Sequence, residues 1–235
     1  MAEASDGQVD RQRGARLLDL VEVMDRLRAG CPWDARQTHE SLAPFLLEET
    51  YEALEALDSG DAQAVREELG DVLLQVVFHA RVAAERQDGT GYTIDDVADG
   101  IVQKLTRRHP HVFGDVAVSG AEEVKANWDA IKAAERAAAS GGPGSILDGI
   151  PLAQPALSLA TALQRRAERA GAPSGLADVA AGEGADDGEV SEIGAELFAL
   201  AAKARAAGLD PELELRSAAR VYRQRVQAWE RSDRD

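Results

Sequence analysis

The stretch FLLEETYEALEALDSGDAQAVREELGDVLLQVVFH, residues 45–79, predicts two helices joined by a tight turn. The turn is DSGD at residues 58–61, where Gly60 can take the left-handed conformation that ends a helix and Asp61 can cap the next one. Leu69, Val72 and Leu73 begin an apolar face that continues along the second helix. This segment therefore predicts an antiparallel helical hairpin.

Four carboxylates lie symmetrically about the glycine of this turn: Glu49, Glu52, Glu68 and Asp71. The first two are three residues apart, as are the last two, so each pair shares a helix face. Gly60 is the midpoint between Glu49 and Asp71, and also between Glu52 and Glu68. A chain reversal at Gly60 is therefore expected to bring all four carboxylates level across the hairpin.

Such a cluster has the chemistry of a hard-cation site, because Mg²⁺ and Mn²⁺ prefer oxygen ligands and commonly bind substrate phosphates as well. Without a cation, about four negative charges held together would be costly. A zinc site is a weaker interpretation, since no Cys and His spacing matches one. A pair of solvated acidic helix faces remains the alternative.

Composition points to a helical protein that does not bind nucleic acid. The chain has 235 residues, low aromatic content (4%) and abundant alanine, which favour closely packed helices over strands. A net charge of −16 argues against a nucleic-acid surface, which needs basic residues to displace counterions. The single cysteine, Cys31, excludes an internal disulfide and fits a reducing compartment. With no apolar signal region and no stretch of about 20 apolar residues, we expect a cytoplasmic protein without a membrane partner.

Further helices are expected at residues 14–30, 94–109, 122–138, 152–170, 189–207 and 211–231. Ser41 is predicted to cap the first helix of the hairpin, and Thr93 the helix after it. We expect a disordered N-terminus at residues 1–13, a catalytic domain at 14–139, a linker at 140–146 and a second helical region at 147–235. The linker SGGPGS lacks the Lys-Ser/Thr of a phosphate-binding loop.

A basic cluster follows the hairpin, with Lys104, Arg107 and Arg108 near the end of one helix. Lys104 lies one turn before Arg108 on the same face, which suits two contacts to one polyphosphate. The alternative is an ordinary helix C-terminus, where basic residues complement the dipole. Trp33 and Trp128 could stack on a base, although tryptophan is more often core or interface.

Three histidines, His79, His109 and His111, could each gain or lose a proton in a functional role, although a hydrogen-bonded structural role is commoner for histidine. Cys31 is interpreted as a packing residue. No Ser-His-Asp or Cys-His arrangement has a supporting local signature.

The second half of the chain resembles the first. The segment ELGDVLL, which begins at Glu68, is similar to EIGAELF, which begins at Glu192. The second copy lacks two of the candidate site residues. Ala195 occupies the position that corresponds to Asp71, and Val221 occupies the position that corresponds to Lys104. The segment GAPSGLADVAAGEGADDG, residues 171–188, replaces its first acidic helix. One live site and one structural copy are therefore expected, and chance similarity between Ala-rich helices is the alternative.

Several ordered motifs together resemble the MazG-type nucleoside triphosphate pyrophosphohydrolases. They are CPWDARQTHESLAPFLLEETYEALEAL, EELGDVLLQVVFHA, KLTRRHPHVFGD and NWDAIKAAER, which lie within residues 15–136. The resemblance implies an all-α fold with a four-helix-type unit that forms a homodimer. It also implies Mg²⁺-dependent hydrolysis of a nucleoside triphosphate to the monophosphate and pyrophosphate, in nucleotide-pool house-cleaning.

The same resemblance implies roles for individual residues. The metal ligands are Glu49, Glu52, Glu68 and Asp71. Glu48 is placed to orient or deprotonate the attacking water, or to hold a further ion. Lys104 and Arg108 bind the triphosphate, and Trp128 contacts the nucleotide.

Two other functions stay open. One is a non-catalytic helical dimer that binds nucleotide or metal, since the degenerate copy shows that the architecture persists without its ligands. The other is a narrower pyrophosphatase for dUTP, dCTP or damaged nucleotides, because no residue that reads a base edge can be identified.

Overall fold

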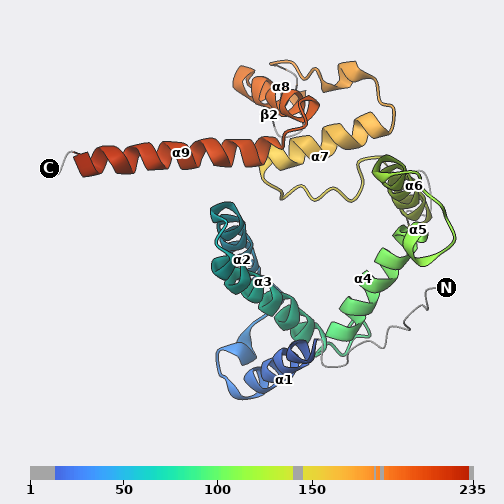
Figure 1. Cartoon of the computed structure of the whole chain (residues 1–235), viewed down its shortest axis with the longest axis vertical. Helices are drawn as coiled ribbons and strands as arrows, with labels where there is room; N and C mark the ends of the chain where they lie inside the picture. Colours follow the sequence, from blue (N-terminus) through green and yellow to red (C-terminus); the bar gives the residue numbers. More distant parts are fainter. Residues whose placement is uncertain (1–13, 140–144, 183, 186–187, 233–235) are drawn as a thin grey trace, which may run out of the picture. The chain divides into compact units, whose positions relative to one another are not determined.

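A computed structural model describes residues 14–139, 145–182, 184–185 and 188–232 (Figure 1). The regular structure in these ranges is almost entirely helical, which confirms the all-α fold class. The chain forms two compact units, Met1–Lys132 and Ala133–Asp235. The expected disordered N-terminus at 1–13 lies outside the described residues, as do residues 140–144 of the expected linker.

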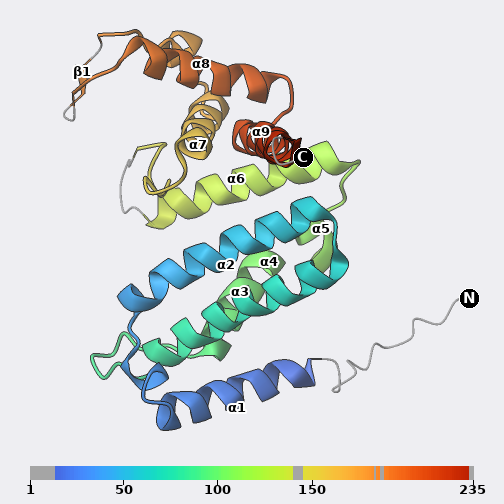
Figure 2. The same cartoon turned by 90° about the vertical axis from the view of Figure 1, so that its left-hand side faces the viewer.

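The first unit contains α1 to α5, the 3₁₀ helix η1 and the start of α6. Their bounds are α1 Ala15–Gly30, η1 Asp34–Arg36, α2 His39–Ser59, α3 Ala62–Ala83, α4 Ile94–Arg108, α5 Pro110–Phe113 and α6 Ala121–Ala139. Helices α2 and α3 run antiparallel and side by side, and α1 packs against α3 (Figure 2).

Helices α2 and α3 form the predicted hairpin. Gly60 ends α2 at φ 71°, in the left-handed region, and the Asp61 side chain caps α3 by accepting from the backbone N–H groups of Gln63 and Ala64. A side chain at position 60 would meet no atom within 4 Å, so the backbone angle alone favours glycine there. The predicted chain reversal at Gly60 is confirmed.

The start of α2 differs from the expectation. Ser41 is not the cap; the helix begins at His39, and the Thr38 side chain accepts a hydrogen bond from the Ser41 N–H. The Ser41 hydroxyl in turn accepts from the Thr38 N–H at 2.9 Å, which completes a reciprocal capping box. Because two backbone donors are satisfied at once, the helix starts two residues before Ser41, and Pro44 falls inside it.

The core of the first unit lies where α1, α2 and α3 meet. Met24, Leu42, Val77 and Phe78 are buried there, and partly buried residues from α1, α3 and α4 pack around them. Ile94 in the first turn of α4 is one of these, so α4 starts against the core.

Arg28 ties the loop after α1 to the end of α3. Its side chain is 8% exposed and forms two hydrogen bonds to Glu85, at 2.8 and 2.7 Å. It also donates to the backbone carbonyls of Asp34 and Gln37. The Arg28 guanidinium lowers the pKa of the Glu85 carboxyl, first by hydrogen bonding and then by its charge.

The second unit packs three helices, α7 Ala156–Arg169, α8 Glu192–Ala206 and α9 Pro211–Ser232, around the small residues Ala160 and Ala201. Gln164 is buried and donates from Nε2 to the Phe198 carbonyl at 2.9 Å. Between α7 and α8, the described residues contain no α-helix. They form η2 Ser174–Ala177 and a two-residue antiparallel ladder of β1 Gly184–Ala185 with β2 Gly188–Glu189.

No helix in the described part of the chain is both long and apolar enough to span a bilayer.

Candidate active site

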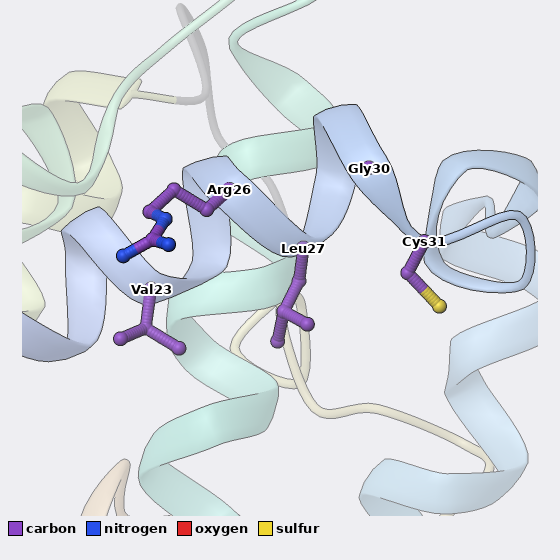
Figure 3. A pocket seen from close by; sticks show the side chains of 5 residues that line it. All are labelled: Val23, Arg26, Leu27, Gly30 and Cys31. Atoms are coloured by element: carbon purple, nitrogen blue, oxygen red, sulfur yellow. The ribbon is translucent and has the colours of Figure 1, made fainter.

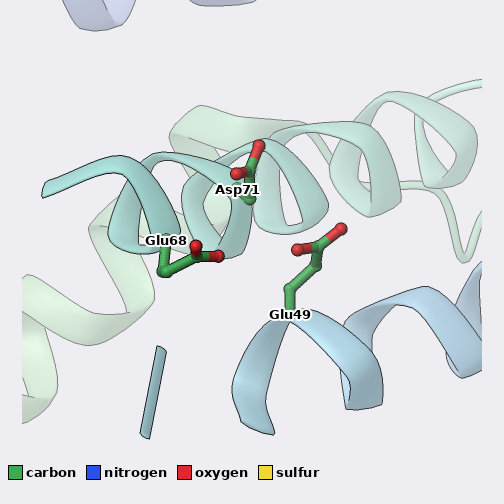
Figure 4. Close-up of side chains that lie close together, drawn as sticks. All are labelled: Glu49, Glu68 and Asp71. Atoms are coloured by element: carbon green, nitrogen blue, oxygen red, sulfur yellow. The ribbon is translucent and has the colours of Figure 1, made fainter. Parts of the chain in front are cut away.

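The hairpin brings three of the predicted ligands into one group. Oxygen atoms of Glu49 on α2 and of Glu68 and Asp71 on α3 all lie within 4.8 Å of one another. Figure 4 shows the three carboxylates facing each other across the space between the two helices. Glu49 and Glu68 are half-buried and Asp71 is exposed, so solvent reaches the group.

The group is electrostatically strained in the absence of a cation. The pKa of the Glu49 carboxyl is raised from its ordinary value, first by burial and then by the charges of Asp71, Glu52 and neighbouring carboxylates. The pKa of Glu68 is also raised, by burial and then by Glu52 and Asp71. Both shifts mean that negative charge is harder to hold here than in water.

Glu52 and Glu48 lie close to the group but outside it. Glu52 is exposed and is not among the oxygens within 4.8 Å, yet its charge contributes to the raised pKa of both Glu49 and Glu68. Glu48 is exposed, and its charge acts on Glu49. Glu49 therefore lies within the influence of four other carboxylates.

This donor set suits a hard divalent cation. Three carboxylates from two helices can offer oxygen ligands while an exposed side leaves room for water or a phosphate. A divalent charge would also offset the repulsion from neighbouring carboxylates that, after burial, raises the pKa values of Glu49 and Glu68. The residues present therefore fit a magnesium-type ion on chemical grounds.

The predicted phosphate-binding residues lie on α4, outside the carboxylate group. Lys104 is exposed and Arg108 is half-buried in the last turn of the helix. His109 ends α4, and its Nδ1 lies 2.7 Å from the Leu105 carbonyl oxygen.

Trp128 lies on α6, where histidine and lysine side chains contact its ring. The centroids of His109 and Trp128 are 6.1 Å apart, and the Lys132 ammonium lies 4.9 Å from the Trp128 centroid. Trp128 is 37% exposed, so part of its ring remains accessible. Trp33, in contrast, makes edge contacts with Phe45 and Phe78 at the margin of the core.

A separate hollow of about 390 Å³ lies on α1 and contains none of the predicted site residues. Figure 3 shows its lining of Val23, Arg26, Leu27, Gly30 and Cys31. Cys31 is partly buried at its edge and forms no disulfide.

Sequence reasoning did not single out one contact between the two hairpin helices. His39 Nδ1 lies 2.8 Å from His79 Nδ1, and the two rings are stacked with an interplanar angle of 4°. A partial signal was available, because reflection about Gly60 places His39 opposite residue 81, two residues from His79. Gln75, between Asp71 and His79, is buried, and its Oε1 has no hydrogen-bond partner among the described residues.

Comparison with known proteins points to one family. The family model described as the MazG nucleotide pyrophosphohydrolase domain matches residues 37–113, which include the whole hairpin. A Thermotoga maritima protein named nucleoside triphosphate pyrophosphohydrolase/pyrophosphatase MazG is 39% identical over 233 residues, covering 94% of this chain and 88% of that protein.

Other relatives differ in length. A Streptomyces cacaoi protein named only as an uncharacterised 26.1 kDa protein is 48% identical, over 92% of this chain and 84% of its own length. The Mycobacterium tuberculosis nucleoside triphosphate pyrophosphohydrolase is also 48% identical, over 71% of this chain but 49% of its own length. The chain thus spans about half of the mycobacterial relative. A crystal structure of a MazG-related protein from Thermotoga maritima matches 49% of the chain at 28% identity with a TM-score of 0.43.

Proposed function

Because this chain belongs to the MazG family of nucleotide pyrophosphohydrolases, we propose that it hydrolyses nucleoside triphosphates to the monophosphate and pyrophosphate. The observation that carries the proposal is the convergence of Glu49, Glu68 and Asp71 from two helices within the segment that matches the family. Convergent carboxylates with raised pKa values are suited to a divalent cation, and a cation is what an acidic protein needs to accept a polyanion.

The residues proposed to hold Mg²⁺ are Glu49, Glu52, Glu68 and Asp71. When bound, the ion supplies Lewis-acid polarisation of the phosphate and a lower pKa for water. Glu52 is included because its charge acts on both Glu49 and Glu68, which supports its assignment to the same ion.

The proposed reaction is attack of water on the α-phosphorus. The water oxygen forms the new P–O bond, the bond from the α-phosphorus to the bridging oxygen of the β-phosphate breaks, and pyrophosphate leaves. Glu48 accepts the proton of the attacking water, and its exposed carboxylate is adjacent in sequence to Glu49. Lys104 and Arg108 balance the charge that develops on the departing pyrophosphate.

Trp128 is proposed to contact the nucleotide with the accessible part of its ring. Its contacts with His109 and Lys132 restrain the orientation of the indole before substrate arrives. A restrained ring loses less conformational entropy on binding.

The proposed organisation is a catalytic domain at residues 14–139 and a degenerate helical region at 147–235, in a cytoplasmic homodimer. Large apolar side chains at the surface of the single chain support association. Leu18 on α1 is 71% exposed, and Val102 on α4 is 57% exposed. House-cleaning of the nucleotide pool is the proposed cellular role.

A product-resolved assay tests the reaction. The full chain is incubated with each nucleoside triphosphate and Mg²⁺, and the products are separated by anion exchange. We expect monophosphate and pyrophosphate in equal amounts. Release of orthophosphate with the diphosphate would contradict attack at the α-phosphorus, and binding without turnover would favour the non-catalytic module.

A further inference from the structure

His39 and His79 link the two helices that carry the site. Their Nδ1 atoms are 2.8 Å apart, and the ring centroids are 5.1 Å apart. At this separation one Nδ1 donates a proton and the other accepts it, so the contact requires one proton between the two nitrogens. A pair protonated on both Nδ1 atoms has no acceptor and loses the bond.

The contact closes the end of the hairpin that the turn leaves open. His39 is the first residue of α2, and His79 lies in the last turns of α3, whereas Gly60 joins the helices at the other end (Figure 2). Glu49 is ten residues from His39 and Asp71 eight from His79, about 15 and 12 Å along the helix axes. The carboxylates thus lie between a covalent turn and a hydrogen-bonded pair.

The carboxylates on the two helices repel one another. Burial, followed by charges that include those of Asp71 and Glu68 on α3, raises the pKa of Glu49 on α2, so part of this shift is repulsion across the hairpin. At the end of the hairpin opposite Gly60, no covalent link joins α2 and α3. The contact between His39 and His79 opposes the repulsion at that end. Cation binding needs the opposed oxygens to stay close, so this restraint also favours the bound state.

The surroundings of His79 disfavour a second proton. The imidazole is partly buried, and its Nε2 is buried without a hydrogen-bond partner among the described residues. Burial, followed by the charge of His39, lowers the pKa of His79. His39 is also partly buried, and the nearest carboxylate on its own helix is Glu40, which responds to the His39 charge.

Several charged groups on the elements around α3 form ion pairs or hydrogen bonds with residues other than His79. Arg28 binds Glu85, and Arg81 pairs with Asp25 on α1 at 2.6 Å. Asp96 on α4 accepts hydrogen bonds from Thr93. None of these groups contributes to the lowered pKa of His79, whose causes are burial and His39 alone.

We propose that the His39–His79 hydrogen bond is a positioning contact for the site, which holds α2 at the spacing from α3 that Glu49, Glu68 and Asp71 need to share one cation. This inference rests on the proposed function. The neutral or singly protonated pair keeps the bond, and double protonation releases it.

The sign of the pH effect follows from the lowered pKa. In the unfolded chain His79 takes up its proton near its ordinary value of 6.5, whereas in the folded chain it does so at lower pH. The stability linked to neutral His79 is therefore complete above pH 6.5, and it is lost as the pH falls through the lower pKa of the folded chain. Metal affinity should fall over the same range, in addition to any effect of the carboxylates.

The test uses Mn²⁺ alone as the probe, titrated calorimetrically into the full chain at about pH 8 and about pH 5.5, on either side of ordinary histidine titration. Amide hydrogen exchange of residues 39–49 is measured under the same conditions. His39→Leu removes the bond. His39→Asn keeps an amide near the position of Nδ1 but does not titrate. Gln63→Ala is the control, because the Gln63 side chain forms hydrogen bonds with Arg66 and Glu67, both on α3.

At about pH 8 we expect His39→Leu to bind Mn²⁺ about three- to tenfold more weakly, as loss of one partly buried hydrogen bond would produce, and to exchange faster over residues 39–49. His39→Asn should regain most of the affinity and show a smaller loss between the two pH values than the wild type. Gln63→Ala should match the wild type in Mn²⁺ affinity at both pH values and in hydrogen exchange.

Wild-type affinity in His39→Leu would overturn the proposal, as would failure of His39→Asn to recover or an unchanged pH dependence in that variant. The outcome is separable from the proposed function. A wild-type chain that does not bind Mn²⁺, or does not release pyrophosphate, contradicts the site assignment. Unchanged hydrogen exchange in His39→Leu contradicts the positioning contact whichever way those assays turn out.

Discussion

Glu49, Glu68 and Asp71 come from two helices and lie in one group, where burial and then neighbouring carboxylates raise the pKa of Glu49 and of Glu68. Only part of this arrangement follows from residue spacing. The symmetric positions about Gly60 predict that the carboxylates meet, but Glu52 lies just outside the closest group. Side-chain rotamers and burial decide such differences, and neither can be read from sequence numbers.

Asp71→Asn is expected to lower Mg²⁺-dependent pyrophosphate release at least about a hundredfold, because even outer-shell partners of a metal typically matter ten- to hundredfold. The change keeps the shape of the side chain and removes a ligand charge. Pyrophosphate release at saturating Mg²⁺ is the measurement. Glu22→Gln is the control, since Glu22 is an exposed carboxylate on α1 and outside the group. Full activity in Asp71→Asn would exclude Asp71 as a ligand.

Glu49→Gln should make the metal-free protein more stable at neutral pH, although it removes a ligand. The raised pKa means that Glu49 contributes stability below its ordinary value of 4.5 and loses it as pH rises through the folded value. The variant should therefore melt above the wild type near pH 7, and the difference should vanish in acid. Melting curves in a chelator measure it.

Added Mg²⁺ should reverse the order of the two proteins, because binding stabilises only the chain that keeps its ligand. Glu22→Gln on α1, an exposed carboxylate outside the cluster, is the matched control and should leave the melting temperature unchanged. A wild type that is more stable than Glu49→Gln without metal would show that the group is not strained.

At the scale of elements, the α2–α3 hairpin is the unit that positions the site. Its turn was predictable, because Gly60 and Asp61 each satisfy a local backbone need. Its start was not. Thr38 and Ser41 are both good caps, and the choice between them depends on the reciprocal bond that forms only when the helix begins at His39.

Two glycines of the hairpin should respond to alanine with opposite signs. Gly60→Ala is expected to destabilise by about 1–2 kcal/mol, because the residue has φ 71° and L side chains disfavour that region. Gly70→Ala, inside α3, should stabilise by about 0.5–1 kcal/mol, since alanine loses less conformational entropy in a helix. Neither added Cβ would meet an atom within 4 Å, so packing does not confuse the comparison.

Urea unfolding of the two glycine variants measures the difference. Equal effects of the same sign would show that Gly60 does not hold the left-handed conformation in solution.

The Arg28 side chain joins α1 to η1 and to Glu85, two residues after the end of α3. Arg28→Met is expected to cost about 2–4 kcal/mol, because it removes the donor to two backbone carbonyls and leaves Glu85 with Arg81 as its remaining ion-pair partner. Arg16→Met is the control, since its ion pair with Asp19 is exposed and should be worth less than about 1 kcal/mol. Urea midpoints of the two variants should therefore differ clearly, and equal midpoints would contradict a structural role for Arg28.

At the scale of the whole molecule, the two units differ in what they retain. The first has the carboxylate hairpin, and the second contains α8 and α9, the helices in which the proposed repeat would lie. In the described residues between α7 and α8, η2 and a short ladder occupy the region where the first acidic helix would be. Ala195 lies on α8 and Val221 on α9, where the repeat predicts an acidic and a basic residue.

A fragment ending at Ala139 is expected to keep Mg²⁺-dependent pyrophosphate release, because every proposed site residue precedes that position. Its rate per site should lie within about threefold of the full chain, a difference well under 1.4 kcal/mol in barrier. Activity and light-scattering mass of both forms are the measurements, and a dimer is expected for the full chain. Loss of activity in a folded fragment would assign the second unit a part in the site.

The sequence by itself determined the helices, the turn at Gly60 and the family, because these depend on local backbone preferences and on long ordered motifs. It also predicted that Glu49, Glu68 and Asp71 would meet, since helical periodicity and a chain reversal place them on facing sides, but it expected Glu52 to join them. Only the tertiary structure decided which carboxylate oxygens come within 4.8 Å of one another. It alone also showed the hydrogen bonds between Arg28 and Glu85 and between His39 and His79. These contacts join residues far apart in the chain, and their geometry depends on how the helices pack and on which rotamers that packing allows.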